Sequence, residues 1–123
     1  MEDCIVKVEH VSHRYTVQWA VNDISFEIPR NGIYGMLGSN GAGKSTLMNI
    51  LCGVLRQTKG DVFINGVNMR EHPIEAKKHI GFMPQQPPLY NDITVEEYLS
   101  YAADLRHIPQ RKVKEAVERV LAL

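Results

Sequence analysis

The sequence predicts an α/β domain, and three stretches of the chain support that fold class. Residues 33–37, IYGML, are short and continuously apolar, as expected of a strand covered on both faces. A glycine-rich loop follows, and from Lys44 onward apolar residues recur at the spacing of a helix. Residues 5–11 and 24–28 are rich in β-branched and aromatic residues, which favours strands. Strand, loop and helix in succession, after earlier strands, are typical of α/β architecture.

The N-terminal strands and the first helix show distinct apolar patterns. Residues 5–11, IVKVEHV, alternate in part and predict a first strand. In residues 24–28 the apolar side chains alternate with polar ones, so this second strand should bury one face. The helix that begins at Lys44 should carry a single apolar stripe, formed by Leu47, Ile50, Leu51, Val54 and Leu55.

Turn signals divide the middle of the chain. Residues 61–67 predict a β-hairpin, because Asn65-Gly66 suits a two-residue turn that needs positive φ. Residues 73–78 begin with a proline and should form a short helix. Residues 80–85, IGFMPQ, predict another strand.

The C-terminal third should contain two helices. Thr94 and Glu97 form the T-x-x-E pattern of a capping box, which predicts a helix start at this point. The last helix ends on LAL without a C-terminal glycine or polar tail, so we interpret the sequence as part of a longer protein. The expected apolar positions are Val95, Tyr98, Leu99, Ala102 and Leu105 in the first of these helices, and Val113, Val117, Val120 and Leu121 in the second.

Length and charge restrict the function classes. The chain has 123 residues, close to the size of one domain. Its 14 Lys+Arg residues balance 14 Asp+Glu residues, giving a formal net charge of zero. That balance gives no electrostatic reason to expect nucleic acid as a partner. Any anion site must therefore be local.

Cysteine, histidine and apolar content add further limits. Cys4 and Cys52 lie far apart and fit neither a CxxC pair nor a disulfide framework. His10 and His13 lack the further ligands of a metal site, so we expect both to be solvated. The longest apolar run, residues 50–55, is far shorter than the roughly 20 residues that span a bilayer.

The chemistry of the chain is concentrated in residues 38–46, GSNGAGKST. They fit G-x-x-x-x-G-K-[ST], between a predicted strand and a predicted helix. Glycines let backbone N–H groups approach a phosphate closely, and the helix N-terminus adds partial positive charge. Lys44 can reach the β- and γ-phosphates, and the Ser45 hydroxyl can bind Mg²⁺. The expected phosphate-binding residues are Gly38, Ser39, Asn40, Gly41, Ala42, Gly43, Lys44, Ser45 and Thr46.

Other glycine-rich motifs fit this loop less well. A dinucleotide fingerprint G-x-G-x-x-G starting at Gly41 would need glycine at position 46, where Thr46 stands. The glycine loop of protein kinases fails for the same reason. A nucleoside triphosphate is therefore the expected ligand.

Three motifs in order resemble the nucleotide-binding domain of ABC transporters. Tyr15 lies 23 residues before Gly38, VNDISFEI follows it, and IGFMPQ lies beyond the predicted hairpin. The resemblance covers essentially all 123 residues and implies the N-terminal part of a P-loop NTPase fold of the ABC ATPase kind. Residues 1 to about 90 would be the core with A-loop, Walker A and Q-loop, and about 91–123 the start of the helical subdomain. Residues 81–106 are most similar to ATP-binding subunits of ABC-2 type exporters.

The resemblance assigns roles to individual positions. Tyr15 matches the aromatic residue that stacks on adenine, and Val21 matches an aliphatic residue that packs beside the nucleotide. Gln85 matches the Q-loop glutamine, which reaches Mg²⁺ or the attacking water. Gln86 follows directly and is the alternative for this position. Lys44 and Gln85 would be the catalytic residues, and Ser45 and Gln85 the Mg²⁺ ligands.

The resemblance also implies an activity and partners. The parent protein would hydrolyse ATP with Mg²⁺ as a head-to-tail dimer with a second nucleotide-binding subunit. It would drive a transmembrane permease from the cytoplasmic face of the cell membrane. The LSGGQ signature, the Walker B aspartate and the switch histidine have no matching positions, so we expect these 123 residues alone to be inactive.

Two alternatives remain open. The chain could belong to another P-loop NTPase, a kinase or a GTPase, although a GTPase should also show an N/T-K-x-D guanine motif and we expect none here. It could also be a soluble ABC protein that acts on nucleic acid or ribosomes, which the zero net charge disfavours.

Overall fold

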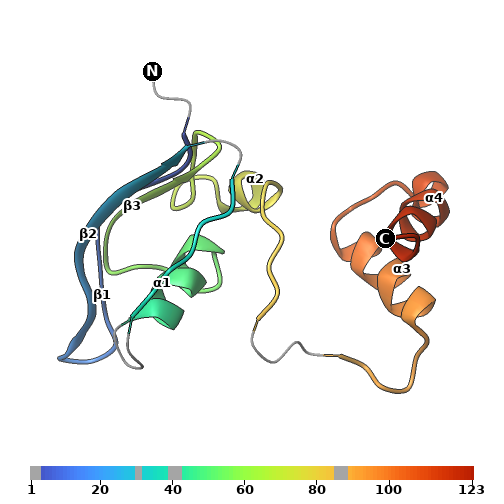
Figure 1. Ribbon diagram of the computed structural model, residues 1–123, viewed down its shortest axis with the longest axis horizontal. Helices are drawn as coiled ribbons and strands as arrows, with labels where there is room; N and C mark the ends of the chain where they lie inside the picture. The colour runs from blue at the N-terminus through green and yellow to red at the C-terminus, as the bar shows by residue number, and fades with distance from the viewer. Residues whose placement is uncertain (1–3, 30–31, 39–42, 85–88) are drawn as a thin grey trace. The chain divides into compact units, whose positions relative to one another are not determined.

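The computed structural model describes residues 4–29, 32–38, 43–84 and 89–123. The chain separates into two compact units, Met1–Phe82 and Met83–Leu123. The first unit contains a sheet with α1 and α2, and the second contains α3 and α4. Figure 1 shows the elements of both units.

The sheet of the first unit has four antiparallel strands in the order β2-β1-β3-β4. The strands are β1 (Cys4–Arg14), β2 (Trp19–Pro29), β3 (Lys59–Ile64) and β4 (Val67–Asn68). The predicted hairpin is confirmed, because Asn65 (φ 50°) and Gly66 (φ 83°) form the two-residue turn between β3 and β4. The two predicted N-terminal strands are also confirmed, and both are longer than their sequence patterns indicate.

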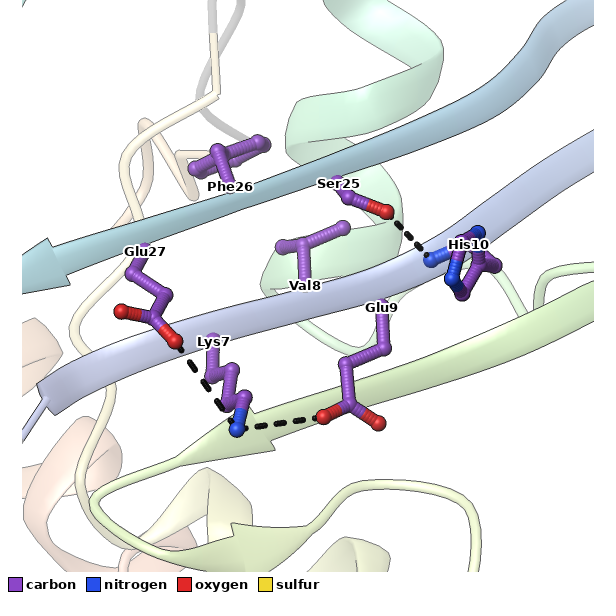
Figure 2. Close-up of a pocket in the computed structure, with 7 residues that line it drawn as sticks. All are labelled: Lys7, Val8, Glu9, His10, Ser25, Phe26 and Glu27. Carbon is purple, nitrogen blue, oxygen red and sulfur yellow. Dashed lines mark hydrogen bonds and ion pairs between the residues drawn. The ribbon is translucent and has the colours of Figure 1, made fainter. Parts of the chain in front are cut away.

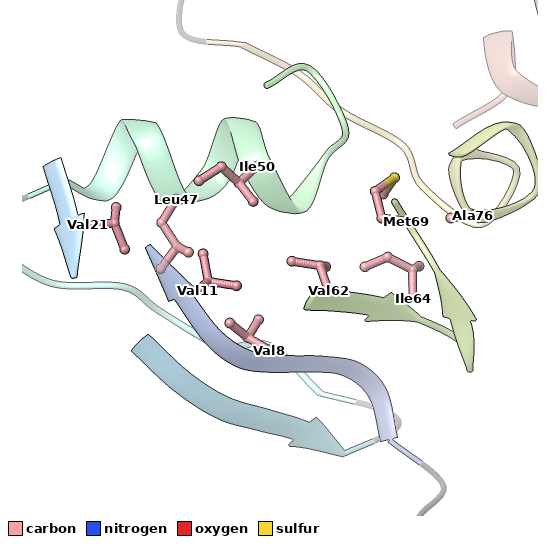
Figure 3. Packing of buried hydrophobic residues seen from close by; sticks show 9 residues of the cluster. All are labelled: Val8, Val11, Val21, Leu47, Ile50, Val62, Ile64, Met69 and Ala76. Atoms are coloured by element: carbon pink, nitrogen blue, oxygen red, sulfur yellow. The ribbon is translucent and has the colours of Figure 1, made fainter. Parts of the chain in front are cut away.

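One face of the sheet packs against helix α1 (Lys44–Leu51). Leu47 and Ile50 of the helix point toward the strands (Figure 3). The largest fully buried side chains are Ile50, Val8, Val11 and Val62. Removing such side chains from water provides the main favourable term for this unit, about 1.5–3 kcal/mol each as an upper estimate.

Helix α1 ends earlier than its apolar stripe predicts. Cys52 caps it and Gly53 adopts φ 77°, so the chain leaves the helix before Val54, which is exposed. The N–H of Gly53 donates to the Ile50 carbonyl, and that of Val54 to the Asn49 carbonyl. This is the bonding pattern of a Schellman C-cap, for which glycine is the preferred residue.

The predicted strands at 33–37 and 80–85 are not formed. Residues 32–38 and 80–84 are neither helix nor strand, and neither segment finds a ladder partner in the part of the chain that the structure describes. A strand covered on both faces depends on hydrogen bonds from neighbouring strands, and apolar residues alone do not supply them. Ile33 and Leu37 are instead fully exposed.

Strand β1 contains an irregularity at His10, which adopts φ 49°. Strict alternation would place Val8 and Val11 on opposite faces, because they are three positions apart. Both belong to the same buried core. The register shift between them therefore reverses which side chains of the later part of β1 face the core. His13 is consequently only 7% exposed, and the expectation that it is solvated is wrong, whereas His10 is exposed as expected.

The second unit is a pair of helices, α3 (Val95–Leu105) and α4 (Gln110–Leu121). The predicted capping box is confirmed: Thr94 Oγ1 accepts the Glu97 N–H at 3.1 Å, and Glu97 Oε1 accepts the Thr94 N–H at 2.8 Å. Ala103, Val113 and Val117 form its small core. The short helix α2 (Pro73–Lys77) of the first unit also begins at its predicted proline.

Candidate functional site

The N-terminus of α1 has features that favour binding of an anion. Gly43 is its N-cap residue, no side chain caps the helix, and the first turn contains no acidic residue. The Leu47 N–H donates to the Gly43 carbonyl at 2.9 Å and closes the first turn. The N–H groups before it have no partner within the helix, as at any helix start, and the helix dipole adds partial positive charge there. This is the physical basis of a phosphate site.

Gly43 lies against the start of β2. Its backbone is left-handed, with φ 92°, and a Cβ at this position would collide with the Ala20 carbonyl oxygen. The same Cβ would lie 3.3 Å from Val21 Cγ2. The predicted phosphate loop and Val21 are therefore neighbours, and only glycine fits between them without strain. Val21 itself is buried in the core, next to Gly43.

Tyr15 reaches the same end of α1. Its phenol oxygen lies 3.0 Å from Thr46 Oγ1, within hydrogen-bond distance. Thr46 is buried, whereas Tyr15 is 60% exposed. Two residues that are 31 positions apart in the sequence thus place an aromatic ring beside the start of the helix.

The polar residues of the loop are only partly described. Lys44 Nζ donates to the carbonyl of Gly38, the first residue of the predicted phosphate loop. Ser45 is exposed on the first turn of α1. Ser39, Asn40, Gly41 and Ala42 lie outside the described residues, as do Gln85 and Gln86. The roles of all these residues therefore stay predictions.

The polar face of β1 and β2 does not offer an alternative anion site. A hollow of about 460 Å³ is lined by Lys7, Glu9, Ser25 and Glu27 together with their neighbours (Figure 2). The Lys7 ammonium lies 3.2 Å from Glu9 and 3.8 Å from Glu27, so two carboxylates already surround its positive charge. An anion would meet net negative charge there.

The thiols are poor candidates for nucleophilic chemistry. Neither Cys4 nor Cys52 takes part in a disulfide, as expected from their separation in the sequence. Burial raises the pKa of the Cys52 thiol above its usual value, which lowers the fraction of reactive thiolate at neutral pH. Within the described ranges no three potential ligands gather in a way that could hold a metal ion.

The expectation of no guanine motif is wrong at the level of letters, because residues 58–61, TKGD, fit N/T-K-x-D. The structure gives these residues other contacts. The hydroxyl of Thr58 accepts the Arg14 N–H at 3.1 Å, and Asp61 Oδ1 accepts from Asn68 Nδ2 at 3.3 Å. Lys59 Nζ lies 5.3 Å from the centre of the Trp19 ring. We therefore interpret this tetrapeptide as part of the sheet.

Comparison with known proteins identifies the family. The profile of the ABC transporter family matches residues 21–122. The chain belongs to the ABC transporter family. Both the family that the sequence resembles and its fold, the N-terminal part of the ABC ATPase, are thus confirmed. Within the described residues, the strands expected at 33–37 and 80–85 are not formed, and α1 is shorter than predicted.

Individual ABC proteins are similar over most of the chain. The probable multidrug ABC transporter ATP-binding protein YbhF of Escherichia coli is 30% identical over 118 residues, which are 96% of this chain and 20% of YbhF. The structure of cbiO1 from Clostridium perfringens, part of the cbiONQ transporter complex, matches 98% of this chain with a TM-score of 0.80 and 28% identity. This chain spans 50% of cbiO1, so it corresponds to about half of such a solved chain.

A third similarity concerns the fold alone. A dimeric ATP-binding cassette, MJ0796, solved in a post-hydrolysis state with ADP and Pi, matches 95% of this chain with a TM-score of 0.79 at 22% identity. This chain spans 56% of it. Separately, no helix in the described part of the ABC chain combines the length and the apolar character that crossing a bilayer requires.

Proposed function

We propose that this ABC chain binds ATP with Mg²⁺ and that the full-length protein hydrolyses it to power transport. Tyr15 receives the adenine, residues 38–46 bind the triphosphate, and Gln85 acts on Mg²⁺ or the attacking water. Hydrolysis requires a second nucleotide-binding subunit, and the energy is delivered to a permease at the cytoplasmic face of the membrane. We assign it the role of an ATP-binding subunit of an ABC-2 type exporter, and its similarity to YbhF, a probable multidrug ABC transporter ATP-binding protein, supports the role of an ATP-binding subunit.

One observation carries the proposal: Tyr15 lies beside the uncapped N-terminus of α1, with its hydroxyl 3.0 Å from Thr46. A phosphate loop alone would suit many phosphorylated ligands. An exposed aromatic ring next to it adds a flat apolar surface, on which a base can stack. The fold brings Tyr15 and Thr46 together from two distant segments of the chain. One nucleotide would span them, with its base on Tyr15 and its triphosphate at the start of α1.

The residues of the site act mainly by position and charge. The helix N-terminus and backbone N–H groups hold phosphate oxygens, and Lys44 exchanges its contact with the Gly38 carbonyl for a phosphate oxygen. Such preorganised donors stabilise the charge that develops during phosphoryl transfer. The buried Val21 keeps Gly43 in place beneath the phosphates.

The chain offers a suitable donor for Mg²⁺. The Ser45 hydroxyl is a hard oxygen ligand and is exposed on the first turn of α1, where no acidic side chain competes. Mg²⁺ is usually held by few protein oxygens together with phosphate oxygens and water. One protein hydroxyl is therefore compatible with a Mg²⁺ site. When bound, the ion would neutralise part of the charge of the triphosphate.

Isothermal titration of the full-length protein with ATP tests the proposal. Lys44→Ala should weaken ATP binding by about 1.5–3 kcal/mol, which is about ten- to a hundredfold in Kd, because charge-assisted hydrogen bonds are lost. Lys78→Ala is the matched control, since Lys78 pairs with Glu75 on the surface at 3.5 Å. Equal ATP affinities of the wild-type protein and Lys44→Ala would refute the assignment. A preference for GTP over ATP would instead support the GTPase alternative.

A further inference from the structure

His13 lies directly beside Tyr15. The two ring centres are 4.7 Å apart, and the ring planes are nearly perpendicular at 86°. This edge-to-face arrangement is one of the favourable geometries for aromatic pairs. Tyr15 is 60% exposed and His13 only 7%, so the histidine supports the tyrosine from the interior and leaves much of the phenol ring accessible.

The imidazole is itself held in place. His13 Nδ1 lies 3.3 Å from Thr58 Oγ1, and the same hydroxyl accepts the Arg14 N–H at 3.1 Å. Thr58 immediately precedes β3, so this contact ties the end of β1 to the start of its neighbouring strand. A buried polar ring without such a partner would be costly, and the hydrogen bond therefore favours a single orientation.

The opposite end of Tyr15 is held by α1. Its hydroxyl reaches Thr46 Oγ1 at 3.0 Å, while its ring contacts His13. The register shift at His10 makes this arrangement possible, because it turns His13 toward the core. Contacts at two points, one on the ring and one on the hydroxyl, restrict both side-chain torsions of the tyrosine.

We propose that His13 is a positioning residue for base recognition: it holds the Tyr15 ring in the orientation that receives adenine. This inference rests on the proposed function. A surface tyrosine that is free to rotate must lose that freedom when a base stacks on it, which weakens binding. The contact with His13 removes the rotation before the nucleotide arrives. The triphosphate does not touch the ring, so its own binding is independent of His13.

The test compares ATP with inorganic tripolyphosphate in calorimetric titrations of the full-length protein. The readout is the ratio of the tripolyphosphate Kd to the ATP Kd. His13→Ala should lower this ratio about three- to tenfold through weaker ATP binding, with the tripolyphosphate Kd unchanged. His13→Phe should restore more than half of the logarithmic loss, because it keeps the ring contact. His72→Ala, which removes an exposed histidine before α2, should leave the ratio unchanged.

The possible failures are distinguishable. If Tyr15→Ala lowers the ratio and His13→Ala does not, base stacking stands and the role of His13 is refuted. Equal weakening of both ligands by His13→Ala would also refute it, since that result indicates general damage. If His13→Ala does not fold, Thr58→Val decides: a lowered ratio supports the proposal and an unchanged ratio overturns it. A wild-type ratio near one would overturn the proposed function together with this inference.

Discussion

Gly43 is the residue at which the sheet, the helix and the loop meet. Its left-handed backbone starts α1, and its missing side chain lets β2 approach. Each constraint alone favours glycine, and both together exclude every other residue without a shift of the backbone.

Gly43→Ala should therefore reduce the affinity for ATP more than the addition of one methyl group would suggest. The combined strain is of order 1–3 kcal/mol, which corresponds to a loss of about five- to 150-fold in affinity. Gly35→Ala is the control, because a Cβ there meets nothing within 4 Å. Titration calorimetry checks the affinity, and circular dichroism checks that both variants are folded. Equal ATP affinities of the two variants would contradict the close approach to Ala20.

The sequence predicts residue types at the site better than their environments. The loop pattern and Tyr15 could be found from spacing, because a glycine-lysine-serine run and an aromatic residue are visible as letters. The burial of His13 could not, because it depends on one left-handed residue three positions earlier that shifts the face of the strand. Residues 58–61 match the guanine motif in residue type alone, because the fold uses them for contacts within the sheet.

Among the elements, α3 has the clearest local determinant. Its capping box satisfies two N–H groups at the helix start and lowers the pKa of Glu97, mainly through the backbone hydrogen bond with Thr94. A carboxyl group with a lower pKa in the folded state favours folding when it is ionised. This stabilisation is present above the unfolded pKa of about 4.5 and is lost as the pH falls through the lower folded value.

Glu97→Gln should remove that pH-dependent part of the stability of α3. Glu96→Gln is the matched control, because it removes a carboxylate from the same first turn without breaking the capping box. Thermal unfolding followed by circular dichroism between pH 3 and 7 measures the difference. The wild-type protein and Glu96→Gln should lose this part of their stability on acidification, and Glu97→Gln should not. Identical pH profiles for both variants would show that the cap does not ionise as described.

Elements set by neighbouring residues were predicted correctly, and the two strand predictions that failed concern segments that need distant partners. The Asn65-Gly66 turn, the proline of α2 and the capping box each act within a few residues, and all three predictions are confirmed. The strands expected at 33–37 and 80–85 need ladder partners from elsewhere in the chain. Apolar composition signals that such a segment tends to be buried, but it does not provide the hydrogen bonds of a sheet.

At the level of the whole molecule, the first unit exposes much apolar surface. A cavity of about 770 Å³ opens between the sheet, α1 and residues 34–36, with a mostly apolar lining. Ile33, Leu37 and Val54 are also exposed nearby in sequence. Exposed apolar surface of this kind favours association. By contrast, Val113 and Val117 of the second unit are buried in a cluster with Ala103 of α3, whereas Val120 is exposed.

The isolated 123-residue chain should therefore self-associate. Sedimentation velocity at two protein concentrations should show a larger mean mass at the higher concentration. The isolated chain should also bind a hydrophobic dye more strongly than the full-length protein does. A sharp, reversible unfolding transition that does not change with concentration, together with a single monomer peak, would contradict this prediction.

The central claim is that Tyr15 and the N-terminus of α1 bind the two ends of one ATP molecule. A crystal structure of the full-length protein with Mg²⁺ and a non-hydrolysable ATP analogue tests it most directly. We expect the adenine on the Tyr15 ring and the triphosphate on the N–H groups that follow Gly43, with Lys44 on a phosphate oxygen. A triphosphate bound elsewhere, or an adenine that does not touch Tyr15, would contradict the account.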